Sequence, residues 1–554
     1  MSAAGGASVK SKAVYPAVIP ADGSSGAVLT VRTTAPASSV LIELVAGGTL
    51  PLASIDAQTF SAVLSADQLL FSYVASDVNR NFVGGIKVTD AATSEVRTFN
   101  FFVNVDDATI PDVPVESSAS DMRCGAHVVN LEVPADDPAG LWDPPYDDIE
   151  GVLTRFYEVF GDVYEFVNVV FLRPDLMTNR DHFGARNDVH GIGLPIFNNT
   201  AAYGSAGTLL GITRFPLDNF FDLAEPGALH ELGHQWINFL TPFPILGAGS
   251  PHWPASEPAH GLMGMSIPGG VVGGQFPFKF VPISGNSYTL TSEPPTGVFS
   301  PLDLYLMGFI PAHAVPSFVV LDPPGQALID GTTVTATTVG IDQVIDTMGP
   351  RIPDSAASSK HFRMATVLVT RTGLLSDREI AFFDYFAARG EAVAPLPFAS
   401  GFLKGQAFPF PLATQGLGSL DTSVSCPVPI PHDLGDEAAI CKLCPPDPCI
   451  ACNGLLHGIV LVVFPEVTAA AVRRSLNTKI VNADQAYKRG QLTAAANQLD
   501  AFLNEIHAQS GKALTSQAAD GIGSLTMRAA EVLGIPLAGI RTAASAQQVT
   551  SPPR

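Results

Sequence analysis

Hydrophobic and polar residues follow a strand-like pattern in the first fifth of the chain. Between about residues 12 and 115, short runs of alternating character are separated by turn clusters such as 22–26. The runs lie at 29–31, 40–44, 69–74 and 99–105. Short strands with frequent turn signals predict an antiparallel β-sandwich. This part has no constellation of catalytic residues, so its default role is a spacer or an adhesion module.

The pattern changes to helical spacing near the other end of the chain, over about 455–541. One apolar stripe stops at Gly490, a residue that often follows the last turn of a helix, and a second stripe begins directly after it. The stripes comprise Leu476, Ile480, Ala483 and Tyr487, then Leu492, Ala495, Ala496, Leu499, Phe502 and Ile506. We therefore expect an antiparallel helical hairpin within a small bundle.

The middle of the chain, about 117–420, mixes both periods and predicts an α+β unit. Helices are expected at 146–163 and 376–389. Residues 187–195 are expected to form a glycine-punctuated strand that leads into a turn, and this strand could border a cleft and pair with an extended substrate. His190 in that strand is expected to be structural or to line the cleft rather than to bind a metal. The Gly- and Pro-rich stretch 264–298 is either loops around a cleft or disordered surface.

Two histidines and a glutamate within 228–240 carry the main chemical signal. His230, Glu231 and His234 form the pattern H-E-x-x-H. Residues four apart lie on the same face of a helix, so both imidazoles can reach one metal ion. Glu231 would then take a proton from water that the metal activates. Apolar residues at helical spacing through Leu240 and the dipeptide Thr241-Pro242 predict that the helix continues to about residue 240.

A catalytic zinc site has three protein ligands and an open fourth position, so a third ligand must come from elsewhere. The candidates from the following segment are His252, Glu257 and His260, and Asp303 is a more distant one. Ile237 and Leu240 stand where a metzincin has its Gly and third His, which excludes that class. A gluzincin would supply Glu257 from a second helix, but the sequence around it does not predict a helix.

Several strings together resemble a group of bacterial secreted proteins with a zinc-peptidase domain. They are His-Glu-Leu-Gly-His-Gln-Trp from 230, Pro-His-Trp at 251–253, Gly-Leu-Met-Gly at 261–264 and Ser-Pro-Leu-Asp-Leu-Tyr-Leu-Met-Gly-Phe at 300–309. In that group a His-Trp pair follows the motif helix, so the resemblance favours His252 as the third ligand. The segment that follows His-Trp is acidic and polar in the group, whereas this chain has Pro254-Ala255-Ser256. The run 490–504, with Gln-Ser-Gly-Lys at 509–512, is similar to the FIMAH domain, a helical module appended to bacterial secreted proteins.

Asp303 and Tyr305 are polar residues within a strongly apolar segment. Asp303 could orient a ligating histidine, and Tyr305 could donate a hydrogen bond to the oxyanion that forms when water attacks a peptide carbonyl. The alternative is that both residues are ordinary edges of the core.

Six cysteines are present, and four of them, Cys441, Cys444, Cys449 and Cys452, form two C-x-x-C pairs. They could hold a structural zinc, although the loop between the pairs is short for that purpose. With Cys124 and Cys426 the number is even, so disulfides are the favoured alternative in an exported chain, with no pairing deducible. This segment, 421–454, is expected to link the central and helical units.

Charge and hydropathy narrow the class of partner. The net charge of −22 disfavours nucleic acid and anionic membrane surfaces. The longest apolar run, 459–464, is far shorter than the roughly 20 residues of a membrane span. The first 19 residues lack the pattern of a signal peptide.

The sequence therefore predicts a multidomain chain. Its units are an Ig-like β-sandwich (12–115), a zincin-like metallopeptidase domain (117–420), a Cys- and Pro-rich linker (421–454) and a FIMAH-like helical domain (455–541). The expected function is a secreted or cell-surface zinc endopeptidase with one catalytic zinc ion, a protein or peptide substrate and Glu231 as general base. The alternatives are an extracellular binding or adhesion protein with an inactive motif, and a zinc hydrolase that acts on another bond. Substrate specificity and oligomeric state are not predicted.

Overall fold

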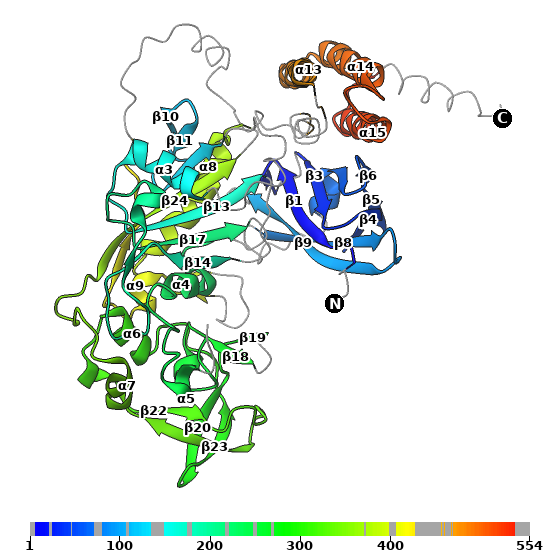
Figure 1. The fold of residues 1–554 in the computed structure, drawn as a ribbon. Coiled ribbons are helices and arrows are strands. Elements are labelled where there is room, and N and C mark those ends of the chain that lie inside the picture. Colours follow the sequence, from blue (N-terminus) through cyan, green and yellow to red (C-terminus); the bar gives the residue numbers. More distant parts are fainter. Residues whose placement is uncertain are drawn as a thin grey trace.

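The chain folds into several sheets and a C-terminal helical region (Figure 1). The computed structural model describes the residues that follow: 6–21, 25–45, 47–70, 80–106, 110–133, 149–173, 180–216, 221–247, 252–267, 271–370, 373–397, 406–426, 456, 459, 467 and 469–537. The four cysteines between 441 and 452 lie outside these residues.

Two sheets form the N-terminal unit and share one hydrophobic core. The first contains β1 (Val9–Tyr15), β3 (Ala27–Thr33), β7 (Thr59–Leu64) and β6 (Ala53–Ser54), in that order. The second contains β2 (Val18–Pro20), β9 (Val96–Asp106), β8 (Arg80–Asp90), β4 (Ala37–Leu44) and β5 (Thr49–Pro51). The pairing is antiparallel except between β2 and β9, which are parallel.

The strand expected at 69–74 is wrong where it can be checked. Residues 69 and 70 belong to the short helix α1 (Ala66–Leu70), and 71–74 lie outside the described residues. The backbone N–H of Ser65 donates to the side-chain oxygen of Gln68, and this local bond favours the first turn of a helix over a strand.

An eight-stranded mixed sheet forms the centre of the molecule. Its order is β10 (Glu116–Ala119), β11 (Met122–Cys124), β12 (Val128–Glu132), β24 (His361–Thr370), β13 (Phe166–Arg173), β17 (Gly211–Pro216) and β14 (Asp181–Gly184), with β27 (Ser419–Asp421) paired to β24. β12, β24, β13 and β17 are parallel, whereas β14 lies antiparallel to β17. β14 is therefore the last strand at one edge of the described sheet.

Alternating side chains of the central strands enter two different cores. Phe166 and Val170 of β13 belong to the core that contains the motif helix, whereas Val167 and Val169 belong to the core that contains α3 (Ile149–Phe160). Successive side chains of a strand point to opposite faces of the sheet, and here a hydrophobic core covers each face. The helices expected at 146–163 and 376–389 correspond to α3 and to α8 (Asp377–Ala388), which begins after the capping residue Ser376.

The motif helix is α4 (Pro226–Gly233), which is shorter than expected. Its start after Glu225 agrees with the sequence, but the chain leaves the helix at His234 and continues through turns. The backbone of Asn238 has a φ of 79°, a left-handed conformation that cannot continue a right-handed helix. Trp236 and Ile237 are nevertheless buried. The apolar spacing therefore correctly indicated buried positions, although the helix ends before them.

The stretch 264–298 carries strands and not only loops. It contains β18 (Met265–Ile267), β19 (Val271–Gly274), β20 (Phe278–Ser284) and β21 (Ser287–Ser292). A four-stranded sheet with the order β20, β21, β23 (Thr333–Val339) and β22 (Phe318–Leu321) lies at the lower end of the molecule in Figure 1. For residues 187–195 the expected turn is confirmed, because the chain bends at Gly191 and Gly193, both with positive φ. The expected strand is wrong beyond Asn187, where β15 (Arg186–Asn187) ends.

The remaining short elements connect these layers. They are β16 (Phe197–Asn198), β25 (Leu396–Pro397), β26 (Gln406–Ala407), α5 (Pro244–Gly247), α6 (Pro301–Met307), α7 (Ile341–Met348), α9 (Phe410–Ala413), and the 3₁₀ turns η1 (Thr200–Tyr203), η2 (Pro258–His260), η3 (Ala312–Ala314) and η4 (Arg389–Glu391).

The described residues of the C-terminal region include three long helices: α13 (Ala470–Lys488), α14 (Leu492–Gln509) and α15 (Ser516–Val532). The two predicted stripes lie on α13 and α14, which are separated by Gly490 with a φ of 69°. Figure 1 shows this region beside the N-terminal sandwich, and Val28, Ile55 and Val63 of the sandwich share its hydrophobic core. No helix within the described ranges is both long and apolar enough to cross a membrane.

Candidate metal centre

The two motif histidines occupy successive turns at the end of α4. The helix begins at Pro226, whose fixed φ suits the first helical position. His230 lies in its last turn, and His234 directly follows it with a helical φ of −63°. The spacing of four residues therefore brings both rings to the same side although the helix ends early.

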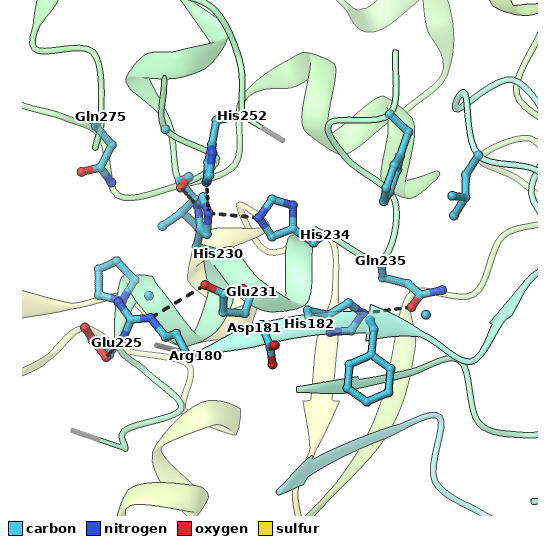
Figure 2. Close-up of a pocket in the computed structure, with 18 of the residues that line it drawn as sticks. Arg180, Asp181, His182, Glu225, His230, Glu231, His234, Gln235, His252 and Gln275 are labelled. Carbon is cyan, nitrogen blue, oxygen red and sulfur yellow. Dashed lines mark hydrogen bonds and ion pairs between the residues drawn. The ribbon is translucent and has the colours of Figure 1, made fainter. Parts of the chain in front are cut away.

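His252 joins this pair from the chain beyond α5 (Figure 2). Its Nε2 lies 2.9 Å from Nε2 of His230, and Nε2 of His234 lies 3.2 Å from the same atom. The three ligand atoms all lie within 4.8 Å of one another. Two nitrogens bound tetrahedrally to one zinc ion at about 2.0–2.1 Å are roughly 3.3 Å apart, so these rings are close to the separation that a shared ion requires.

A backbone carbonyl fixes the protonation of His230. Its Nδ1 lies 2.7 Å from the carbonyl oxygen of Leu262, which can only accept a hydrogen bond. Nδ1 therefore carries the proton, and Nε2 of the neutral ring presents its lone pair to the other two histidines. A carbonyl behind a ligating histidine is a usual partner in metal sites, since it orients the ring and raises its basicity.

Burial keeps the three imidazoles neutral. It lowers the pKa of His230 to about 4 and, together with the neighbouring rings, the pKa of His234 to about 2. The pKa of His252 is also lowered by burial. At neutral pH the cluster offers three uncharged nitrogen donors, which is the state that binds a metal. Three neutral imidazoles that converge in this way can share one metal ion, whereas three charged imidazoles at this distance would repel one another.

Glu231 lies in the same pocket between the histidines and Arg180 (Figure 2). Burial raises the pKa of its carboxyl group to about 7, whereas the cation of Arg180 acts in the opposite direction. Nε of Arg180 is 3.9 Å from Glu231 Oε1, and its Nη1 donates to Glu225 Oε2 at 3.0 Å. The glutamate therefore lies beside the histidines with a nearby cation that favours its charged form.

The pocket around these groups has a volume of about 780 Å³, which is within the usual range of ligand sites. The edge strand β14 forms one wall with residues 181–184, and α4 forms another. The apolar lining residues include Leu194, Phe197 and Phe239. Polar and apolar groups thus surround the histidine cluster within a single cavity that can admit a ligand.

Glu257 and His260, two alternative third ligands, bond elsewhere. Glu257 Oε2 accepts a hydrogen bond from the backbone N–H of Val319 at 2.8 Å. The ring nitrogens of His260 contact the carbonyl oxygens of Phe276 and Pro294, at 2.5 and 2.9 Å. Neither residue belongs to the histidine cluster or to the pocket lining among the described residues.

Asp303 and Tyr305 do not line the described pocket either. Asp303 is fully buried and its Oδ1 accepts a hydrogen bond from Trp253 Nε1 at 2.9 Å, so it contacts the neighbour of His252 and not a histidine itself. The hydroxyl of Tyr305 accepts a hydrogen bond from the backbone N–H of Arg351 at 3.1 Å. This placement gives no support to the predicted oxyanion role of Tyr305. His190 pairs with Ile352 through the backbone and is also away from the pocket lining.

Sequence reasoning missed several polar residues of the pocket, among them Arg180 and His182, and gave no role to Gln235, which directly follows the motif. Nε2 of His182 lies 3.1 Å from Gln235 Oε1, and its Nδ1 lies 2.9 Å from the hydroxyl of Thr213. Gln235 also donates through Nε2 to the carbonyl of Arg186 at 2.9 Å. These bonds connect β14 and β17 to Gln235, the residue that follows the motif. The three segments are distant in the sequence and lie together only in the folded chain.

Comparisons with protein-family models, with curated proteins and with solved structures found no match to this chain.

Proposed function

We propose that this chain is a zinc-dependent endopeptidase. The observation that supports the proposal most strongly is the convergence of His230, His234 and His252 in a pocket that also contains Glu231. Three imidazole ligands with a glutamate beside them are the donor set of a catalytic zinc site, which leaves one position free. Structural zinc sites have four protein ligands, and no fourth His, Cys, Asp or Glu joins this cluster within the described residues.

The residues of the pocket have distinct roles in the proposed mechanism. A zinc ion held by the three histidines would activate a water molecule and polarise the carbonyl of the bound peptide. Glu231 accepts the proton that the attacking water loses, and delivers it to the amine that leaves when the C–N bond breaks. The carbonyl of Leu262 keeps His230 in the tautomer that can bind the metal.

The edge strand β14 supports a peptide as the substrate. It ends the strand order of the central sheet, and its residues line the pocket beside the histidines. An extended peptide can add to such an edge through backbone hydrogen bonds. The proposed substrate-pairing strand is therefore 181–184, a few residues before the segment that the sequence indicated.

The proposal includes an extracellular location, the two resemblances to known families and the Ig-like form of the N-terminal sandwich. The disulfide between Cys124 and Cys426 supports an oxidising compartment, because such bonds are rare in the cytosol. The zincin-like central unit, the Ig-like sandwich and the FIMAH-like helical module remain part of this proposal, which rests on the motif strings and on the arrangement of sheets and helices.

Cleavage of a diverse peptide library by the purified chain tests the function. We expect the wild type to cleave, to lose activity with a chelator and to regain it with zinc. Glu231→Gln should bind zinc as the wild type does and cleave about 10²–10⁴-fold more slowly, the usual contribution of a general base. Glu257→Gln is the matched control, because it makes the same change outside the pocket and should cleave normally.

Two results would contradict the proposal. Cleavage by Glu231→Gln at the rate of the wild type would exclude the mechanism. Zinc binding by the wild type without any cleavage, after a test with and without proteolytic processing of the chain, would favour the binding or adhesion alternative.

A further inference from the structure

His252 differs from the other two histidines in how it is held. His230 and His234 are fixed by α4, whereas His252 lies in a segment without regular secondary structure. The Nδ1 atom of His252 is buried and has no hydrogen-bond partner among the described residues. Its ring stacks on His230 with a centroid distance of 4.9 Å, but no carbonyl or carboxylate orients it from behind, as Leu262 orients His230. The position of this ligand must therefore come from its chain neighbours.

Trp253, the next residue, is fixed firmly. Only 1% of its surface is exposed, and it is among the largest fully buried side chains of the described residues. Its single donor, Nε1–H, binds Asp303 Oδ1 at 2.9 Å. Adjacent Cα atoms are about 3.8 Å apart, so a fixed Trp253 limits the positions that the backbone of His252 can take.

Asp303 is in turn fixed by the start of α6. Its Oδ2 accepts a hydrogen bond from the backbone N–H of Ser300 at 2.9 Å, and its own N–H donates to Ser300 Oγ at 3.2 Å. This reciprocal pair is the capping box of the helix. Burial raises the pKa of Asp303 to about 6, whereas its hydrogen bonds to Ser300 and Trp253 act in the opposite direction by stabilising the charged form.

The other end of α6 is anchored as well. The guanidinium group of Arg351 donates to the carbonyl oxygens of Leu306 and Met307 at 2.8 and 3.1 Å. The backbone N–H of the same arginine binds the hydroxyl of Tyr305. α6 is thus a platform held at both ends, and Asp303 extends from it to Trp253.

We propose that Trp253 and Asp303 are positioning residues, whose buried hydrogen bond sets the place of His252 as a zinc ligand. This inference rests on the proposed function only in taking zinc as the metal. In this proposal the apolar segment 300–309 supports the metal centre, because Asp303 holds Trp253, the neighbour of the ligand His252. The segment does not contact the substrate.

Zinc affinity, measured by competition with a chelator, tests this proposal without any peptide. Trp253→Phe keeps most of the ring volume and removes the donor, and Asp303→Asn keeps the shape and removes the charge. We expect each variant to bind zinc about 10–100-fold more weakly than the wild type, the usual effect of losing a residue that supports a metal ligand. The visible spectrum of the cobalt-substituted protein should also change, since the geometry of the ligands changes.

Tyr157→Phe is the matched control. Its hydroxyl donates a buried hydrogen bond to the carbonyl of Tyr164 at 3.1 Å, in the core on the opposite face of the central sheet. It should lower the melting temperature without changing zinc affinity or the cobalt spectrum. Folded Trp253→Phe and Asp303→Asn variants with wild-type affinity and spectrum would overturn the inference.

The outcome separates this inference from the proposed function. Weakened binding by both variants, together with a wild type that binds zinc but cleaves no peptide, would support the positioning role and contradict the peptidase. A wild type that binds no zinc would overturn both.

Discussion

At the scale of single residues, Asp90 connects the two sheets of the N-terminal unit. It ends β8, and its carboxylate accepts hydrogen bonds from the backbone N–H groups of Ala92 and Thr93 in the following turn and from the hydroxyl of Thr93. It also accepts one from the N–H of Ala7, which precedes β1 of the other sheet, at 2.7 Å. These donors lower the pKa of Asp90 to about 2.

Asp90→Asn should therefore destabilise the protein in a pH-dependent way. A carboxyl group whose pKa is lower in the folded state than in the unfolded state, where it is near 3.8, stabilises the fold above pH 4. That contribution disappears as the pH falls from about 4 to about 2. We expect the melting temperature of the variant to be lower than that of the wild type at pH 5–7, and the difference to vanish near pH 2. A difference independent of pH over this range would contradict the assignment.

The site residues differ in how far the sequence could predict them. His230, Glu231 and His234 are predictable because their spacing alone places them on one helix. His252 was favoured only through a resemblance, since an irregular segment separates it from the motif. Arg180 and His182 could not be predicted, because they reach the pocket only when β14, which contains His182 and directly follows Arg180, pairs with β17 at the edge of the sheet.

At the scale of elements, two glycines of α15 make a matched pair. A Cβ on Gly521 would collide with the carbonyl oxygen of Ser54 in β6, whereas a Cβ on Gly523 would meet only Leu503 Cδ2 at 4.0 Å. Gln517 of the same helix donates to the hydroxyl of Ser54 at 2.6 Å. Gly521 therefore lies where the helix packs closely against the strand.

Alanine at these two positions should have opposite effects on stability. Gly523→Ala should stabilise the protein by about 0.5–1 kcal/mol, because glycine inside a helix costs conformational entropy. Gly521→Ala should destabilise it by about 1–3 kcal/mol, because the backbone of β6 must move. Urea denaturation measures both, and equal effects of the two substitutions would mean that α15 does not pack on β6.

Helices with a clear apolar periodicity could be predicted from the sequence, whereas strands in segments rich in turn residues could not. α3, α8, α13 and α14 have apolar stripes long enough to identify a helix. The strands within 264–298 were not predicted because glycine and proline are frequent there and indicate loops. Gly285, with a φ of 52°, lies in the two-residue turn between β20 and β21. Gly-Asn between two alternating runs was the signal that could have indicated this hairpin.

At the scale of the whole molecule, the N-terminal sandwich contacts both other parts. Arg378 of α8 pairs with Asp106 at the end of β9, and the side chain of Glu379 accepts a hydrogen bond from the N–H of Ala17 at 2.9 Å. On its other side the sandwich shares a hydrophobic core with the C-terminal helices. Changes in composition along the sequence indicated separate units. Contacts between the units could not be predicted, because they depend on side chains from distant parts of the chain.

The disulfide is a second long-range feature. Cys124 and Cys426 are 302 residues apart, so the bond joins the beginning of the central unit to its end. The even number of cysteines predicted disulfides but not this pairing, which depends on β11 and the segment after β27 lying close together in the fold. The other four cysteines lie outside the described residues.

X-ray absorption at the zinc edge of the whole, metal-loaded chain would show how many histidines bind the metal. We predict one zinc ion per chain with three imidazole nitrogens and one further oxygen at about 2.0–2.1 Å, and one imidazole fewer in His252→Ala. The histidine cluster would then be an open metal centre of the kind that hydrolysis requires. A shell of sulfur ligands would place the metal at the cysteines instead. Four imidazoles, or an unchanged number of imidazoles in His252→Ala, would also contradict the account.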